Sequence, residues 1–583
     1  MSAVATGGLS DLIVAESSSG ALSSRLRRVR LKLRWVGLVA IVAALLGSGI
    51  GRRAVVNPGG WTLFARFWRA AASPTLSRDF LEQSGRALLT TVAYAVLGAG
   101  LSLVLGALGG VVLSQRALSR RIRTNELSGL TRVLRMMWAI PRGMHEAVWA
   151  LLLLSILGRD PLVAILAIGL PYGAITAKVY ADMLDESAAR QHRTLRAAGA
   201  GRLQALVFGT IPSTAPELVS YAFYRFECAV RAAVVLGMVG AGGIGFQLSQ
   251  SFQGLAYHEM WTSLYVLIGI GAVAEWWSSR VRRQSRSDRG VGRRSLASGA
   301  VLVAASWWYL RPGVSSLWSM RTAHRMGRFF QESFPPKLPR GGWNVLLHAA
   351  LATLHVSFLA IVGATSLAIP LALLAARQRS RRPIHSATDT AAATDVRVAG
   401  TAGVGVGVAD GTAARPRRRW RVGAGPLRWL AGFIALVCRS IPPTVWALLA
   451  LFVLFPGVLP GAVALGIYTA GVLIRLFAES LENADHRPSA LAAASGAGRA
   501  AALAYGTLPT VAPRWAAFAL YRWEVAARDA AVVGVVGAGG LGRLLSEQTA
   551  GFAFPRMTTT ILSLIAVTIL VDAVSSLARS HLR

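Results

Sequence analysis

The chain has 583 residues, of which 54% are hydrophobic and 15% are charged, and its mean hydropathy is +0.50. About a quarter of the residues of a soluble protein are charged, so this composition excludes an ordinary soluble protein and predicts several membrane spans. The net charge is +36, but the arginines concentrate in loops between apolar runs. Positive loops on one side of a lipid bilayer explain this pattern better than a nucleic-acid partner, which we do not expect.

The sequence lacks the motifs of disulfide-rich, metal-binding, ATP-binding and hydrolytic proteins. Cys228 and Cys438 lie in or beside apolar runs, which excludes a disulfide framework and a thiolate metal site. The nine histidines show no HxxxH or HExxH spacing. No GxxxxGK followed by Ser or Thr occurs, nor a nucleophile elbow. We therefore expect no metal, no cofactor bound by this chain and no enzymatic activity of its own.

Two long segments repeat each other without a gap. Residues 199–245 and 496–542 are identical at more than half of their positions. A period this long indicates a duplicated domain rather than a solenoid repeat. The identical pairs include Gly199/Gly496, Arg202/Arg499, Pro212/Pro509, Tyr224/Tyr521, Arg225/Arg522, Glu227/Glu524 and Arg231/Arg528.

Apolar runs of spanning length, about 20 residues each, occur in the same order in both halves. They predict an all-α polytopic membrane protein with about 12 spans in two domains, 35–285 and 286–583, after a basic cytoplasmic segment, 1–34. Residues 378–426 have no counterpart of that length and are expected to form a flexible cytoplasmic insert, passive or regulatory. The runs are 35–50, 87–113, 144–157, 162–180, 214–239 and 260–279, then 296–311, 345–376, 429–455, 459–477, 511–536 and 557–577.

The distribution of arginine predicts the orientation. With the N-terminus inside, the inner segments 116–135, 181–212 and 280–294 are rich in arginine, whereas the outer segments 158–161 and 240–258 are poor in basic residues. The positive-inside rule then places both termini in the cytoplasm. The outer loops 51–86 and 312–343 carry several arginines and do not follow the rule.

A polar segment between the fourth and fifth runs of each half has one layout. A helix is followed by a small-residue turn at Gly199 or Gly496, a second short helix, and Pro212 or Pro509. This order predicts an L-shaped bracket, in which glycine makes the turn and proline fixes the entry into the next span. The alternative is an ordinary helical loop.

These residues carry a resemblance to a known family. The spacing from the glycine to the proline resembles the coupling loop of type I ABC importer permeases. The run GTIPSTAPELVSYAFYRFECAVRAAVVLGMVGAGGIGF resembles the phosphonate-type permeases, as does IPPTVWALLALF at Ile441 to Phe452. The resemblance implies two permease domains fused in tandem, separate ATPase subunits that use the ATP, and an extracytoplasmic solute-binding protein. It implies that the coupling loops dock on the ATPase through Gly199, Arg202, Pro212, Gly496, Arg499 and Pro509.

The loops depart from the family pattern at one position. Family loops begin with a glutamate six residues before the turn glycine, where this chain has Arg193 and Ala490. The acidic residues that would substitute for it lie further upstream: Asp185, Glu186, Glu479 and Glu482.

Charged residues inside the fifth runs are the candidate translocation path. Ionised groups at the bilayer centre cost about 2.5–3.5 kcal/mol each, so we expect them to face protein or water. Glutamate lies four residues before arginine in each copy, which favours an intrahelical ion pair and leaves one arginine per copy without a local partner. The group forms either a packing lock or a path for an oxyanion. Its members are Tyr224, Arg225, Glu227, Arg231, Tyr521, Arg522, Glu524 and Arg528.

A glycine motif repeated after these runs suggests a nucleotide site only superficially. Residues 240–245 and 537–542 spell GxGxxG, but each follows a long apolar run rather than a strand. We expect close helix packing or a turn at an outer gate.

The sequence thus predicts the permease subunit of an ABC importer for phosphonate or a related phosphorus oxyanion. Two alternatives remain: a secondary anion transporter that works without an ATPase, and an ABC permease for a different small solute.

Overall fold

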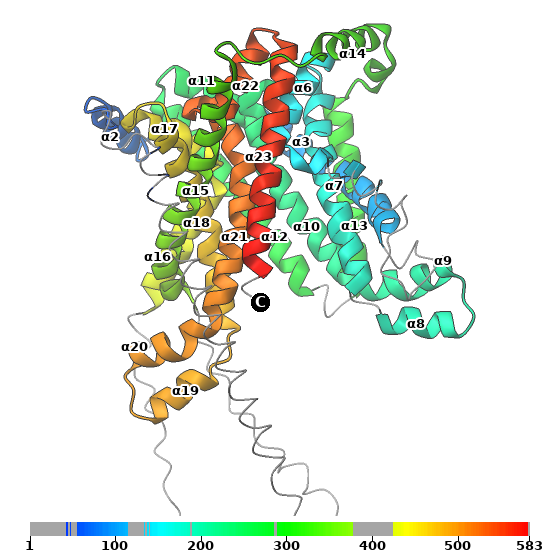
Figure 1. Ribbon diagram of the computed structural model, residues 1–583, viewed down its shortest axis with the longest axis vertical. Helices are drawn as coiled ribbons and strands as arrows, with labels where there is room; N and C mark the ends of the chain where they lie inside the picture. Colours follow the sequence, from blue (N-terminus) through cyan, green and yellow to red (C-terminus); the bar gives the residue numbers. More distant parts are fainter. Residues whose placement is uncertain are drawn as a thin grey trace, which may run out of the picture.

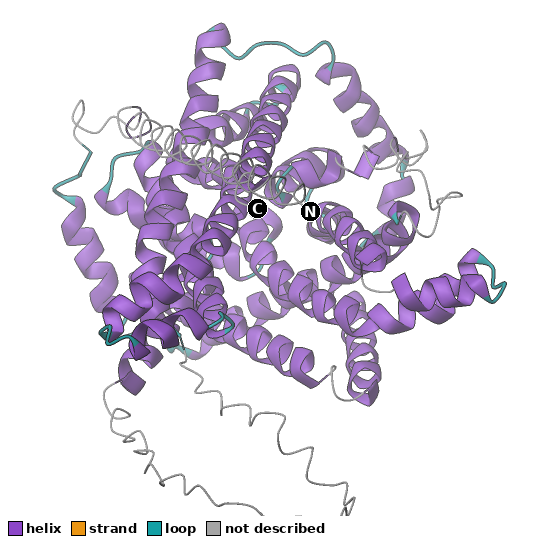
Figure 2. Ribbon diagram, turned by 60° about the horizontal axis from the view of Figure 1, so that its bottom comes forward, coloured by secondary structure: helices purple, strands orange, loops and turns teal. Residues whose placement is uncertain are grey.

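The computed structural model describes residues 55–114, 141–186, 189–284, 289–376 and 424–580, with positions 42, 44, 47, 133, 137, 138 and 140. The regular structure of these residues is helical, as predicted (Figure 2), apart from one antiparallel bridge between Val56 and Leu454. The predicted N-terminal segment 1–34 lies outside the described residues, as does nearly all of the insert 378–426.

The helices of the second half repeat the order of those of the first. In chain order they are α2 (Gly60–Ala70), α3 (Arg78–Leu113), α6 (Glu146–Leu157), α7 (Pro161–Glu186), α8 (Ala189–Ala197), α9 (Arg202–Ala205), η1 (Leu206–Thr210), α10 (Ile211–Leu236), η2 (Gly237–Ala241), α11 (Ile244–Gln253), α12 (Tyr257–Gln284), α13 (Arg289–Leu310), η3 (Val314–Trp318), α14 (Met320–Ser333), α15 (Gly342–Ala375), α16 (Ala424–Ser440), α17 (Pro443–Val453), α18 (Val458–Glu482), α19 (Arg487–Ala494), α20 (Arg499–Ala501), η4 (Ala502–Thr507), α21 (Leu508–Val533), η5 (Gly534–Ala538), α22 (Gly540–Ala550) and α23 (Phe554–Ser580).

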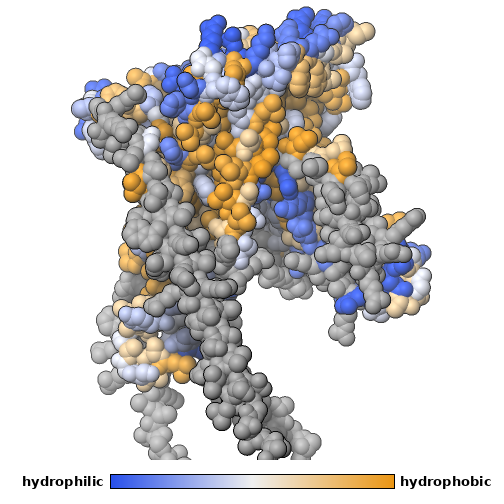
Figure 3. All heavy atoms as spheres, viewed as in Figure 1, coloured by the Kyte–Doolittle hydropathy of each residue, from blue (hydrophilic) through white to orange (hydrophobic). Residues whose placement is uncertain are grey.

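Among the described residues, five helices are long and apolar enough to cross a membrane, and eight if each of three bent pairs counts as one span. The five are α3, α7, α15, α18 and α23. Figure 3 shows hydrophobic residues gathered on the visible face over α15 and α23, with hydrophilic residues above them near α14. The predicted run 35–50 lies largely outside the described residues, so the total of about 12 spans stays a prediction.

The predicted runs 144–157 and 429–455 do not form straight spans. Residues 429–455 form two helices, α16 and α17, which meet at an angle of 95°. Pro442 causes the bend, because a residue before proline is disfavoured in the α conformation and Pro442 itself is followed by Pro443. The corresponding α6 has 12 residues, too few to cross a bilayer.

Helices of each half pack on the other half, and we call the interface between the halves the seam. α3 packs against α7, and α15 packs against α18, which forms the core of each half. α2 of the first half packs on α17 of the second, while α14 of the second packs on α6 of the first. α13 belongs to the predicted second domain but packs on α3 (Figure 1). This packing joins the halves, and the predicted boundary at 285/286 stays untested.

The repeated glycine motif forms a sharp helix bend in both halves. α10 with η2 meets α11 at 55°, and the corresponding pair of the second half meets at 60°. Gly243 and Gly540 have φ of +78° and +73°, and the helix that follows each is capped by Thr91 or Thr353. An added Cβ would lie 2.4 Å or 2.7 Å from the threonine Oγ1. The expected turn is therefore present, and it requires glycine for both backbone conformation and space.

Candidate functional site

The two fifth helices, α10 and α21, meet through equivalent residues. Val235 and Val532 pack together with Ala147 in one buried cluster. Nearer the other end of these helices, Tyr224 and Tyr521 lie within electrostatic range of each other. Their side chains are 43% and 52% exposed. The two helices thus touch at the valines, while the tyrosines stay half-exposed.

Arg225 has partners within its own half. Its Nε and Nη2 donate hydrogen bonds to the Tyr221 hydroxyl at 2.9 Å and 2.7 Å. Its guanidinium also lies over the ring of Tyr172, 5.0 Å from the centroid. A buried charge is stabilised by such hydrogen bonds and by the π face of an aromatic ring. Tyr221 lies four residues before Arg225, which is the spacing that places two side chains on one helix face.

Arg522 occupies the equivalent position but lacks this partner. The residue is 8% exposed, and its Nε and Nη2 have no hydrogen-bond partner among the described residues. Its guanidinium lies 5.8 Å from the centroid of the Tyr468 ring. Phe518 stands where the first half has Tyr221, so no hydroxyl is available four residues earlier.

The predicted intrahelical ion pair forms in one copy only. Arg231 lies 3.4 Å from Glu227. In the second copy the prediction is wrong, because Glu524 pairs with Arg579 of α23 instead. Arg528 donates to the backbone carbonyl of Arg142 in the other half, at 3.2 Å. The sequence could not distinguish these cases, since a partner from another helix competes with the local one.

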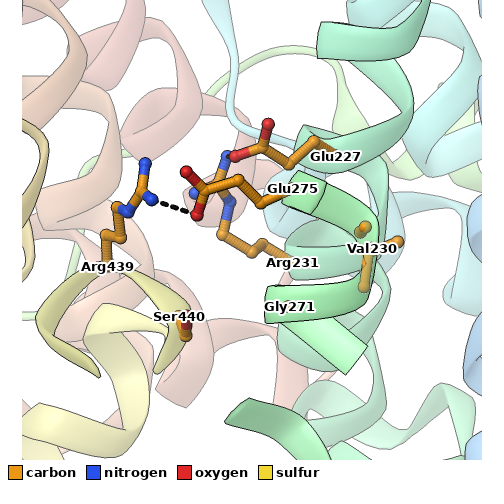
Figure 4. A pocket seen from close by; sticks show the side chains of 8 residues that line it. Glu227, Val230, Arg231, Gly271, Glu275, Arg439 and Ser440 are labelled. Carbon is orange, nitrogen blue, oxygen red and sulfur yellow. Dashed lines mark hydrogen bonds and ion pairs between the residues drawn. The ribbon is translucent and has the colours of Figure 1, made fainter. Parts of the chain in front are cut away.

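A charged network at the seam was missed by the sequence analysis. Glu275 of α12 pairs with Arg439 of α16 and, at 2.7 Å, with Arg475 of α18, which also binds Glu479 at 2.8 Å. The network joins the two halves and borders a small pocket that Glu227 and Arg231 also line (Figure 4). The sequence does hold a sign of this network, because Glu275, Arg439 and Arg475 interrupt the apolar runs 260–279, 429–455 and 459–477.

A second inter-half contact lies near the valine cluster. His145 Nε2 lies 3.3 Å from the Asp529 carboxylate of α21, and His145 Nδ1 lies 3.3 Å from Glu146. Tyr172 donates a hydrogen bond to Glu146 at 3.2 Å. This group was also missed, because His145 and Asp529 have no counterparts of the same type in the other repeat.

The predicted L-shaped brackets are present as two projecting elbows. α8 with α9, and α19 with α20, lie at the ends of two separate legs (Figure 1). Gly199 and Gly496 turn the chain with φ of +88° and +86°. In each elbow a backbone N–H bonds five residues back, from Ala200 to Leu195 and from Ala497 to Ala492, both at 3.0 Å. This pattern is a Schellman motif, which requires the left-handed conformation that glycine adopts.

The prolines do not mark an entry from a loop, which corrects that part of the prediction. From Arg202 onward the first-half chain is helical through η1 into α10, and Pro212 lies inside this stretch. Proline in an α-helix clashes with the carbonyl four residues earlier, which belongs to Phe208 here and to Tyr505 for Pro509. Both carbonyls lie in π-helical turns, η1 and η4, and these wider turns accommodate the prolines.

The surface of the elbows is aromatic at matched positions. Phe208 is 74% exposed and Tyr505 is 83% exposed. Arg202 begins α9 and Arg499 begins α20, but the Arg499 side chain lies outside the described structure. Two of the acidic residues upstream are engaged elsewhere, since Asp185 accepts a hydrogen bond from Ser114 and Glu479 binds Arg475. These two exposed aromatic residues were not predicted from the sequence, although they occupy equivalent positions of the two repeats.

No metal chemistry emerges from the described residues. Cys228 and Cys438 are free, and no group of three or more His, Cys, Asp or Glu side chains in the described part of the chain is placed to hold a metal. What the geometry offers instead is two related halves whose central helices, α10 and α21, carry buried charges and half-exposed tyrosines, with one elbow for each half. This arrangement defines a membrane transport subunit.

The chain belongs to the family described as binding-protein-dependent transport system inner membrane component, which it matches over residues 110–277 and 412–583. The two matches fall in the two halves, so the predicted tandem fusion of ABC permease domains is confirmed. Members of this class are multi-pass membrane proteins that work with ATPase subunits.

Curated relatives are transport permeases. The chain is 27% identical over 451 residues to the phosphate-import permease protein PhnE of Mycolicibacterium smegmatis, covering 76% of both chains. It is 35% identical over 145 residues to the phosphite transport system permease protein PtxC of Stutzerimonas stutzeri, covering 25% of this chain and 53% of that one. It is 42% identical over 89 residues to the putative cryptic phosphonate transport system permease protein PhnE2 of Escherichia coli, covering 15% and 73%.

Proposed function

We propose that this chain is the membrane subunit of an ABC importer for a phosphorus oxyanion and forms the whole translocation path from its two halves. The observation that carries the proposal is the buried guanidinium group of Arg522 on α21, whose Nε and Nη2 have no hydrogen-bond partner among the described residues. Guanidinium groups bind phosphate-type oxygens bidentately. The relatives named for phosphate, phosphite and phosphonate transport support the same substrate class.

The two elbows are the docking sites for the ATPase subunits in this proposal. Phe208 and Tyr505 supply the exposed aromatic contacts, one for each ATPase subunit, since aromatic side chains dominate the energetics of protein interfaces. ATP binds to those partners, and this chain binds no cofactor. The elbows and both termini then face the cytoplasm, and an extracytoplasmic solute-binding protein delivers the anion to the opposite face.

The geometry corresponds to an inward-open state. Val235 and Val532 close the path on the outer side, whereas Tyr224 and Tyr521 are half-exposed on the elbow side. Closure of the ATPase dimer moves the elbows together, and this rigid motion separates the outer ends of α10 and α21. The anion then enters from outside, and ATP hydrolysis returns the halves to the present arrangement.

A reconstituted system tests the function. The chain, its ATPase subunits and the solute-binding protein are placed in liposomes, and uptake of inorganic phosphate, phosphite and methylphosphonate is measured with and without ATP. We expect ATP-dependent uptake of at least one of these anions and none of sulfate. Uptake that persists without the ATPase would identify a secondary transporter, and uptake confined to an unrelated solute would refute the substrate class.

A further inference from the structure

The two buried arginines differ in the hydrogen bonding of the same two atoms. Nε and Nη2 of Arg225 both donate to the Tyr221 hydroxyl. Nε and Nη2 of Arg522 are the atoms without a partner among the described residues. A buried donor without a hydrogen-bond partner is unfavourable, and more so when the group is charged, so two such donors on one guanidinium group indicate a place where a ligand would bind.

The difference arises from one substitution between the repeats. Tyr221 and Phe518 occupy the same position in the aligned segments, four residues before the arginine. The tyrosine hydroxyl occupies the fork of the guanidinium in the first half. Phenylalanine fills a similar volume in the second half and leaves the fork free. Other positions of α10 and α21 also differ, but both helices keep the tyrosine before the arginine, the glutamate two residues after it and the arginine six residues after it. The repeats therefore compare the same charged group with and without the hydroxyl.

The surroundings of Arg522 place it at the seam between the halves. The ring of Tyr468 lies beside the Arg522 guanidinium. Tyr468 also lies within electrostatic range of Arg231 and Cys228 of the first half, and of Asp529. Arg231 is bound by Glu227, and Asp529 faces His145, so each of these charges has a partner. Arg522 is the member of this group whose donors are free within the described structure.

We propose that Arg522, with the Tyr468 hydroxyl beside it, binds the transported anion, and that Arg225 is a structural arginine. The ligand is one tetrahedral phosphorus oxyanion, whose two oxygens accept from Nε and Nη2. The path therefore has a single anion subsite on the side of the second half, despite its twofold repeat. This inference rests on the proposed function, because it assigns the substrate of that transporter to one residue.

The test transfers the tyrosine from the first repeat to the second. The purified complex with its ATPase subunits is titrated with inorganic phosphate, and binding is followed by 31P NMR. Phe518→Tyr supplies the hydroxyl that occupies the guanidinium fork, and we expect the dissociation constant to rise about tenfold. Arg522→Gln should raise the dissociation constant by at least as much, since it removes both charge-assisted donors. Phe518→Leu, which adds no hydroxyl, should leave it within about twofold.

The outcomes separate this inference from the proposed function. If Phe518→Tyr binds phosphate as the unmodified chain does, or if Phe518→Leu weakens binding equally, the free fork is not the binding group and the inference fails. The inference also fails if the unmodified complex binds no phosphate while it still transports phosphorus oxyanions in liposomes. The thermal unfolding midpoint of each variant identifies those that do not fold. Absence of any phosphorus oxyanion uptake by the unmodified system would instead refute the proposed function.

Discussion

The carboxylate of Glu275 on α12 forms an ion pair with Arg439 on α16, and this contact joins the two halves of the chain. The second carboxylate oxygen binds Arg475 of α18 at 2.7 Å. One acidic side chain of the first half thus binds two cationic side chains of the second, and Figure 4 shows its pairing with Arg439. Because this carboxylate joins helices of different halves, a rearrangement that separates α12 from α16 and α18 must break its ion pairs.

Replacing Glu275 by Gln should destabilise the seam. The change leaves Arg439 and Arg475 without their shared anion. The Glu275 and Arg475 side chains are partly exposed, so the cost should lie between the about 1 kcal/mol of an exposed pair and the about 3–5 kcal/mol of a fully buried one. We expect a lower thermal unfolding midpoint for the detergent-purified chain, and partial recovery when Arg439→Met is added. The matched control is Glu82→Gln, which removes an exposed i,i+4 pair with Arg86 and should change stability by less than about 1 kcal/mol. If Glu275→Gln and Glu82→Gln lower the unfolding midpoint equally, the ion pairs of Glu275 stabilise the chain no more than an exposed pair does.

Arg579→Ala tests the ion pair between Glu524 and Arg579, which forms instead of the predicted pair between Glu524 and Arg528. Glu524 is buried and its ion-pair partner is Arg579, so the variant leaves a buried carboxylate with no countercharge. A loss of about 3 kcal/mol in the free energy of unfolding is expected. Arg543→Ala removes a solvent-exposed pair with Glu547 and serves as the comparison. If Arg528 takes over as the partner of Glu524, Arg579→Ala will be as mild as Arg543→Ala.

Gly540→Ala should disrupt the bend before α22. The position has φ of +73°, and an added Cβ would lie 2.7 Å from Thr353 Oγ1, which caps the helix. Left-handed backbone alone costs a non-glycine residue about 1–2 kcal/mol, and the contact adds to it. The expected result is a lower unfolding midpoint and reduced transport. Gly269→Ala in α12, where an added Cβ has nothing within 4 Å, should be neutral or stabilising.

The double variant Phe208→Ala, Tyr505→Ala tests the elbows. Both side chains are exposed, so their loss should leave the stability of this chain nearly unchanged while it weakens association with the ATPase subunits about tenfold or more. Co-purification and ATPase activity measure the effect. Trp318→Ala removes an exposed aromatic residue from η3 and should retain normal association. Retention of the ATPase by the double variant would place the docking site elsewhere.

Much of the architecture follows from local properties of the sequence. Apolar runs of spanning length predict helices because backbone groups in lipid must bond within the segment. The repeat predicts two related halves, and the glycines at 199 and 496 predict turns because only glycine adopts that conformation without strain. The bend at Pro442 was not predicted. Pro442 and Pro443 stand in the sequence, but the mean hydropathy of a long window stays high across them, so residues 429–455 were interpreted as one run.

Packing decided the partners of several charged residues. Glu227 and Glu524 each have an arginine four residues later, yet Glu227 binds that arginine and Glu524 binds Arg579 from α23. Glu275 and Arg439 are far apart in the chain, and no local pattern relates them.

The sequence by itself determined the membrane environment, the duplication and the elbows, because hydrophobicity, repetition and glycine conformation act over a few neighbouring residues. The tertiary structure decided which partners the other buried charges have. The sequence already distinguishes Arg225 from Arg522 by Tyr221 and Phe518, but only the folded helices show that no side chain of another described helix bonds Nε and Nη2 of Arg522. Electrostatic partners are chosen by distance in space, which depends on how distant helices pack.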